Sequence, residues 1–289
     1  MKFMADIETS ADQGAPHTRV ITPDGNLTSL NPGELWRYRA FLQILVWRDL
    51  KVRYKQTVVG LAWALFEPLT MTLIFSIFLG YLIRVPSDKL PYPVFFLTGF
   101  VLWQFFAKTA MAGGQSLVAN RDIVTKLYFP RLLLPASALF VAFADFVVAL
   151  VVVLGFMVYY GVVPTMAILA LPLFVVYAAF CGFAVGVFGA ALNALYRDIG
   201  LALPLIIQIW MFSSPVLYPA SLVPERFQLI YGLNPMVGIV EGFRWTVTGA
   251  GGTVPGVVMF VLPLVVSVVM LAVGLAFFVR AERNLVDRI

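Results

Sequence analysis

Three ionisable residues, Glu67, Lys108 and Asp145, stand inside long apolar stretches of this 289-residue chain. A charged side chain is costly to place among lipid tails, so such residues mark either a functional site or a buried ion pair. Glu67 precedes Pro68, and we predict that it either contacts a ligand or pairs with a neighbouring helix. For Asp145 we favour a buried, paired structural role over contact with a substrate.

The residue types needed for covalent catalysis are scarce and scattered. The single histidine, His17, lies in a polar N-terminal stretch, and the single cysteine, Cys181, lies in an apolar run. Asp49, Asp122 and Asp198 are isolated from one another. No Gly-x-x-x-x-Gly-Lys-Ser/Thr sequence is present to bind nucleotide phosphates. We therefore expect a chain that is not itself an enzyme, with no metal site and no cofactor of its own.

The elements that position these residues are long apolar helices. The chain is 61% hydrophobic and only 12% charged, whereas an ordinary soluble domain carries about 25% charged residues. A span needs on the order of 20 apolar residues to cross the hydrocarbon core. The sequence predicts an all-α polytopic membrane protein with six transmembrane helices. They are expected at about 58–83, 94–112, 132–160, 165–194, 200–217 and 255–279.

Lysine and arginine gather in alternate connections between these spans, which predicts that both termini are cytoplasmic. The basic residues flank apolar segments, so the net charge of +5 indicates contact with membrane lipids and no nucleic acid partner. We expect four regions: a mobile cytoplasmic tail (1–33), an interfacial helix with a basic segment (34–57), a transmembrane domain (58–280) and a cytoplasmic tail (281–289).

Three connecting segments are unusual. A helix at about 34–47 mixes aromatic and polar residues and is predicted to lie along the inner leaflet, with an ordinary cytoplasmic helix as the alternative. Residues 116–127 are predicted to form an exposed cytoplasmic helix with an apolar stripe that docks into another protein. Its alternative is a packed loop helix. It is followed by Phe129, Pro130 and Arg131, which return the chain to the membrane.

The third unusual segment, 218–253, contains two helix starts, at Pro224 and at Asn234-Pro235. Glu241 and Arg244 are three residues apart in the second helix and could pair. Two short helices at the outer face predict a re-entrant gate, because irregular backbone at membrane depth must line a cavity or be buried in protein. A surface loop resting on the headgroups is the alternative.

Aromatic side chains are abundant, with 25 Phe, 11 Tyr and 6 Trp. Most are expected to contact lipid or the membrane interface. Aromatic faces also stack on sugar rings, so a channel could guide a glycan past rings of this kind. Our candidates for such a channel are Trp63, Phe66, Phe106 and Trp210, with Glu67 beside them.

Several motifs in order resemble one family. They are Arg48-Asp49-Leu50-Lys51-Val52-Arg53-Tyr54-Lys55, Trp63-Ala64-Leu65-Phe66-Glu67-Pro68, Asn120 through Lys126, Phe129-Pro130-Arg131, Tyr196-Arg197-Asp198, Ser214-Pro215-Val216 and Asn234-Pro235-Met236. The set, spread over about 34–280, resembles ABC-2 type transporter permeases of the polysaccharide-export branch, which handles O-antigen, capsule and teichoic acid.

The resemblance implies a homodimer of permease subunits that encloses a channel in the cytoplasmic (inner) membrane. Two copies of a separate ABC ATPase, which binds ATP and Mg, would drive it. The implied substrate is a polysaccharide on a polyprenyl-pyrophosphate lipid, with O-antigen for lipopolysaccharide as the expected polymer. Three sets of residues receive roles by position. The coupling set is Leu117, Asn120, Arg121, Lys126, Phe129, Pro130 and Arg131; the pyrophosphate or interface set is Arg48, Lys51, Arg53 and Lys55; the outer gate set is Pro224, Tyr231, Asn234, Pro235 and Arg244.

Three other functions remain open from the sequence. An ABC-2 exporter could carry a small lipid or a drug, although the aromatic content and the long outer segment favour a polymer. A membrane enzyme acting on a polyprenyl lipid would need clustered carboxylates or a histidine near the interface. A passive channel would need no docking helix for a partner.

Overall fold

The computed structural model describes residues 32–55, 62–196, 198–249 and 256–285, and every regular element in these ranges is helical. Residues 1–31 of the predicted tail (1–33) and the last residues, 286–289, lie outside the described residues, and Pro32 and Gly33 belong to the first helix. Within these described ranges, five stretches are long and apolar enough to cross a membrane. They are α4 (Ala62–Phe75) with η2 (Ser76–Leu82), α5 (Tyr92–Ala119), α7 (Leu133–Tyr160), η3 (Met166–Ala170) with α8 (Leu171–Leu195), and η5 (Val257–Val261) with α12 (Leu262–Leu285). The predicted all-α membrane fold is confirmed.

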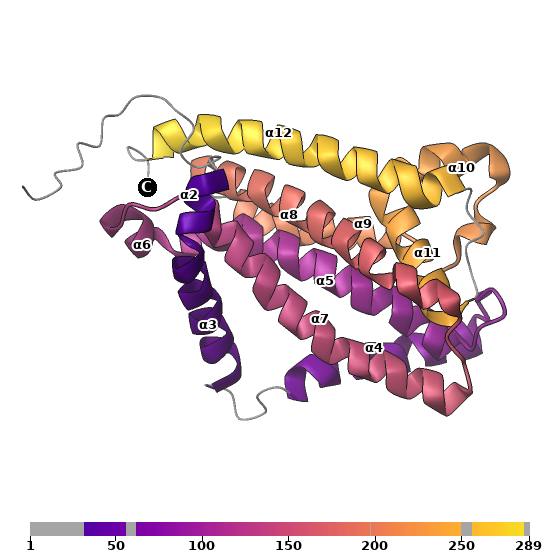
Figure 1. The fold of residues 1–289 in the computed structure, drawn as a ribbon. Helices are drawn as coiled ribbons and strands as arrows, with labels where there is room; N and C mark the ends of the chain where they lie inside the picture. The colour runs from indigo at the N-terminus through magenta and orange to yellow at the C-terminus, as the bar shows by residue number, and fades with distance from the viewer. Residues whose placement is uncertain (1–31, 56–61, 197, 250–255, 286–289) are drawn as a thin grey trace, which may run out of the picture.

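Helix α5 forms the centre of the bundle, with 83% of its most apolar window buried. It packs against α7 and α8, and α12 lies along α8 on the outside (Figure 1). Helix α4 is the least covered span, with 11% of its window buried. The core therefore belongs to α5 and α8, while α4 is attached at the edge of the bundle.

The fifth predicted span is shorter than expected. The structure has α9 at Ile199–Phe212, a helix of 14 residues, and the predicted end at 217 is wrong. At about 1.5 Å per residue such a helix is roughly 21 Å long and falls short of a full crossing. The chain leaves the helix at Ser213 and turns through Ser214 to Leu217, because Pro215 cannot continue the hydrogen-bond ladder.

The N-terminal helix is longer than predicted. Helix α2 spans Pro32–Arg37 and α3 spans Arg39–Lys55, so the expected end at 47 is wrong. No glycine or proline interrupts residues 34–55, and the helix therefore continues through the whole basic segment. Figure 1 shows α3 crossing the direction of the spans steeply, at the end of the bundle where α6 (Arg121–Lys126) lies.

The expected docking helix is also divided differently. Helix α5 continues to Ala119, the chain breaks at Asn120, and α6 spans only Arg121–Lys126. A single helix over 116–127 is therefore a wrong prediction. The part of the predicted docking segment that remains available is the short helix α6 with the exposed residues that follow it, Leu127 and Tyr128.

Two helices cap the opposite end of the bundle from α6 (Figure 1). They are α10 (Glu225–Tyr231) and α11 (Pro235–Thr248), preceded by the short η4 (Ala220–Leu222). Helix α11 is buried along nearly its whole length and packs against α5, α8 and α12. An element that enters the bundle in this way has the geometry of a re-entrant helix.

Gly242 lets α11 approach α8 closely. A Cβ atom at Gly242 would lie 2.0 Å from the ring of Phe174, and one at Gly238 would lie 2.1 Å from the carbonyl oxygen of Val258. The two glycines are four residues apart and share one face of α11. Small residues at such positions let helix backbones pack without a gap.

We predict that Gly242→Ala lowers the free energy of unfolding by about 1–3 kcal/mol, because the added methyl group overpacks a closed contact. The measurement is denaturant unfolding of the purified protein in detergent micelles. Gly155→Ala is the matched control, because no atom lies within 4 Å of a Cβ built at Gly155 in α7. Equal stability of the two variants would contradict the packing argument.

Candidate functional site

The four residues of the predicted pyrophosphate or interface set, all on α3, divide into two pairs. Arg48 Nη2 donates to Asn120 Oδ1 at 2.7 Å and lies 2.7 Å from Asp49 Oδ1. Arg53 Nη1 lies 2.5 Å from Asp145 Oδ2 in α7. Arg48 therefore joins α3 to the junction of α5 and α6, and Arg53 joins α3 to the membrane-spanning helix α7.

The other two cations, Lys51 and Lys55, are exposed on α3. They share a helical face with Ile44 and Trp47, which are 64% and 70% exposed. The face lies away from the buried Leu45. Tryptophan beside lysine is the composition found where helices meet lipid headgroups. This face fits the predicted contact with the membrane interface.

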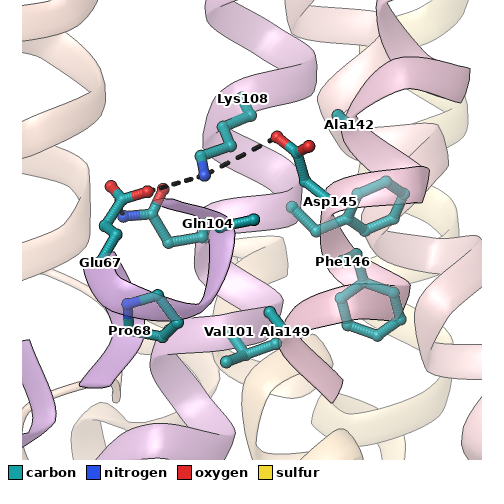
Figure 2. Close-up of a pocket in the computed structure, with 11 residues that line it drawn as sticks. Glu67, Pro68, Val101, Gln104, Lys108, Ala142, Asp145, Phe146 and Ala149 are labelled. Carbon is teal, nitrogen blue, oxygen red and sulfur yellow. Dashed lines mark hydrogen bonds and ion pairs between the residues drawn. The ribbon is translucent and has the colours of Figure 1, made fainter. Parts of the chain in front are cut away.

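Polar side chains of α4, α5 and α7 form a connected chain within the bundle (Figure 2). Lys108 Nζ of α5 lies 2.8 Å from Glu67 Oε2 of α4 and 3.9 Å from Asp145 Oδ2 of α7. Gln104 Nε2 donates to Glu67 Oε1 at 3.0 Å. These residues line a small pocket whose walls include Pro68. Of the two alternatives for Glu67, the structure shows pairing with a neighbouring helix. The prediction that Asp145 is buried and paired is confirmed.

Tyr54 completes this chain from the side of α3. Its hydroxyl donates to Asp145 Oδ1. Burial, and then the hydrogen bond to Asp145, raises the pKa of the Tyr54 phenol above its ordinary value. The phenol therefore remains a donor at neutral pH, and Asp145 accepts from two consecutive residues of α3.

The residues predicted for docking divide into exposed and buried groups. Arg121 and Lys126 of α6 are exposed. Leu117 is fully buried, and Phe129 is 6% exposed, with its ring centroid 4.9 Å from that of Phe41. Pro130 is also buried. We therefore correct the predicted docking surface: these three residues are buried, and Leu117 and Phe129 share an apolar cluster with Leu45 of α3 and with residues of α7, α8 and α12.

The polar residues at the opposite end hold α11 in place. Arg244 is fully buried, and its Nη1 donates to Glu241 Oε1 at 2.6 Å. Its Nη2 donates to the carbonyl of Pro215 at 2.8 Å, and the guanidinium lies 3.8 Å from the ring centroid of Phe95. The predicted pairing of Glu241 with Arg244 is confirmed. In this structure Arg244 faces the interior and joins α11 to α5 and to the turn after α9.

Asn234 is confirmed as the cap of α11, since its Oδ1 accepts from the backbone nitrogen of Met236 at 3.0 Å. The same oxygen accepts from Trp210 Nε1 at 2.8 Å, and its Nδ2 donates to Ser214 Oγ at 3.0 Å. One side chain thus joins the end of α9 to the start of α11. Trp210 is held by this bond.

Two further gate candidates lie nearby. Tyr231 donates to Tyr218 at 3.3 Å and is half-buried. Pro224 is exposed at the start of α10. Pro235 is buried at the first position of α11. The structure gathers the predicted gate residues at one end of the bundle, and their action as a gate stays a prediction.

The aromatic channel candidates do not share one surface. Phe106 is fully buried, with its ring 5.0 Å from those of Trp103 and Trp210, so it is removed from the candidate channel wall. Phe66 of α4 is 56% exposed. The side chain of Trp63 lies outside the described part of the structure.

Sequence reasoning missed Tyr54 and Gln104. Gln104 is one helical turn before Lys108 in an otherwise apolar span, and this spacing could have placed both on the face that meets Glu67. Tyr54 carries no comparable signal, because its partner is 91 residues away. Within the described ranges, no three His, Cys, Asp or Glu residues gather to hold a metal ion.

Comparison with known proteins places this arrangement among membrane permeases. The family model for the ABC-2 type transporter matches residues 40–248. The O-antigen export system permease protein RfbA of Klebsiella pneumoniae is 30% identical over 204 residues, which are 70% of this chain and 78% of that protein. The protein of the same name from Myxococcus xanthus is 31% identical over 216 residues, 73% of this chain and 81% of its own.

A more distant similarity covers more of the chain. The polysialic acid transport protein KpsM of Escherichia coli is 24% identical over 250 residues, 83% of this chain and 93% of that protein. The stretch matched by the ABC-2 family model, residues 40–248, includes α6 and α11 and the polar contacts between helices described above.

Proposed function

Because this chain belongs to the ABC-2 type transporter family, we propose that it is the permease subunit of an exporter that moves a lipid-linked polysaccharide across the cytoplasmic membrane. The expected cargo is a glycan on a polyprenyl-pyrophosphate lipid, of the O-antigen class. The chain supplies the path and no covalent chemistry. A separate ABC ATPase with ATP and Mg supplies the energy.

One observation carries this proposal above the others. Relatives named for O-antigen export and for polysialic acid transport align with this chain over most of its length. The alternatives of a small-lipid exporter and of a membrane enzyme have no comparable support among these relatives. The wide separation of α6 from α10 and α11 (Figure 1) fits a protein that takes energy at one membrane face and releases cargo at the other.

The proposed mechanism assigns one task to each end of the bundle. The lipid-linked glycan reaches the inner face, where Lys51 and Lys55 attract its pyrophosphate. ATP binding closes the partner ATPases, and the motion enters the bundle through α6 and through the Arg48–Asn120 bond that joins the residue before α6 to α3. The motion moves cargo only if the channel contacts the glycan differently in its two states. Weak contacts at many aromatic rings suit a polymer that must keep moving.

The assembly proposed here is a homodimer with two ATPase copies. The exposed apolar faces of α4, η2 and α9 are available to a second copy and to lipid; they include Leu73, Phe78, Leu201, Ile206 and Ile209. In the proposed orientation both chain ends and α6 are in the cytoplasm, and α10 is on the outer side of the membrane.

This orientation makes a labelling prediction. Cys181 is fully buried, so we expect that this natural cysteine does not react with a membrane-impermeant maleimide. Glu225→Cys, on the exposed start of α10, should be labelled in intact spheroplasts. Thr125→Cys, exposed on α6, should be labelled only after the membrane is opened. The reverse pattern would contradict the orientation.

The test of the proposed function is co-purification with candidate ABC ATPases. We expect a stable complex whose ATP hydrolysis in lipid rises when a polyprenyl-pyrophosphate glycan is added. Stimulation by a small lipid or drug and not by the glycan would favour the small-molecule exporter. Chemical change of the lipid by the chain alone, without any ATPase, would favour the membrane enzyme.

A further inference from the structure

Lys108 is placed between two carboxylates on different helices. Its Nζ is 2.8 Å from Glu67 Oε2 on α4 and 3.9 Å from Asp145 Oδ2 on α7, as Figure 2 shows. The first distance is that of an ion pair with a hydrogen bond. The second is too long for a hydrogen bond but still allows electrostatic attraction between the two charges. A rotation of the flexible lysine side chain is enough to exchange the two partners.

Residues of α3 determine which of the two carboxylates Lys108 pairs with. Asp145 already accepts from Arg53, at 2.5 Å, and from Tyr54. A carboxylate whose charge is balanced by one cation attracts a second cation less strongly, and this matters most where water is scarce. Lys108 therefore holds Glu67 while Arg53 holds Asp145.

The pair with Glu67 matters because little of α4 is buried within a single chain. Only 11% of its apolar window is buried, against 83% for α5. Glu67 joins α4 to α5 through two bonds, one to Lys108 and one to Gln104. A helix with so little buried surface is positioned to a large degree by these polar contacts.

We propose that Lys108 is a positioning residue that exchanges between Glu67 and Asp145, and that the contact of α3 with Asp145 decides which carboxylate it holds. With α3 docked, Lys108 ties α4 to α5. When α3 moves away and takes Arg53 with it, Asp145 draws Lys108 across and α4 is released. The link to transport rests on the proposed function: α3 is also bonded to Asn120 beside α6, so motion at α6 reaches α4 by this route.

The test is the maleimide labelling rate of Ala64→Cys, which lines the pocket beside Glu67, in a protein whose natural cysteine is buried. Arg53→Gln should raise the rate about fivefold, the effect expected when the partly exposed Lys108–Glu67 pair is lost. Adding Asp145→Asn to Arg53→Gln removes the charge that draws Lys108 away, so the rate should return to that of the parent. Asp145→Asn alone should leave it low.

Two results would overturn the proposal. If Arg53 only braced α3 against α7, the double variant would be labelled as fast as Arg53→Gln or faster. Unchanged labelling in Arg53→Gln, with folding verified by gel filtration, would also exclude the exchange. Arg39→Gln is the matched control, because Arg39 is on the same helix with its guanidinium 5.1 Å from the Trp36 ring; it should leave the rate unchanged.

A second arm tests the link to transport. In the assembly with the ATPase, ATP should raise labelling of Ala64→Cys in the parent and have no effect in Asp145→Asn. Equal labelling with and without ATP, in an assembly that hydrolyses ATP, would overturn this link. If no ATPase binds the chain, the proposed function fails instead, and the resting rates still decide whether Lys108 exchanges partners.

Discussion

Arg244→Met is expected to lower the free energy of unfolding by about 3–5 kcal/mol, because it leaves the Glu241 carboxylate buried without its cation. Arg244 and Glu241 are both fully buried, 2.6 Å apart. The guanidinium also bonds the carbonyl of Pro215, so its loss frees the turn after α9 from α11. Denaturant unfolding in micelles measures the change.

Two further variants distinguish the effect of the unpaired buried charge on stability from the effect of lost packing. Adding Glu241→Gln to Arg244→Met removes the orphaned charge and keeps an acceptor for the backbone nitrogen of Ala220, so it should recover much of the stability. Arg226→Met on the exposed face of α10 should leave stability unchanged. A double variant no more stable than Arg244→Met would contradict the charge argument.

Replacing Arg121–Lys126 with a Gly/Ser linker of equal length is expected to abolish export and to reduce ATPase binding about tenfold or more, as losses at an interface hot spot do. The exposed surface removed includes Arg121 and Lys126. The retained Leu127 and Tyr128 are 56% and 58% exposed. Pull-down of the ATPase with the tagged chain measures binding, and vesicle transport measures export.

The matched control for this linker lies at the other end of the bundle. Exchange of the exposed Lys89 and Arg226 for glutamine changes surface charge without touching α6, and ATPase binding should not change. Full ATPase binding by the linker variant would move the docking surface away from α6.

The sequence reasoning succeeded where the cause is local. Asn234 caps α11 because its side chain reaches the backbone two residues on, and Glu241 meets Arg244 because they are three residues apart on one helix. The apolar spans follow from composition in the same way. Each of these features depends on neighbours in the chain.

The errors share a different cause. Leu117, Phe129 and Phe106 were assigned to exposed surfaces, yet they are buried because helices distant in sequence pack around them: α3, α8 and α12 around Leu117 and Phe129, and α9 against Phe106. The end of α9 and the break at Asn120 could not be placed by apolar runs alone. The partners of Lys108 lie 41 and 37 residues away in opposite directions, and no single-sequence pattern records such contacts.

The most direct test of this account is transport in inverted membrane vesicles that contain the chain and its ATPase. A polyprenyl-pyrophosphate glycan is supplied outside, where the cytoplasmic face is exposed, and its protection from a glycosidase is followed with and without ATP. We predict ATP-dependent protection that is lost in the α6 linker variant. Glycan that stays fully digestible beside an assembly that hydrolyses ATP would contradict the polysaccharide-export function.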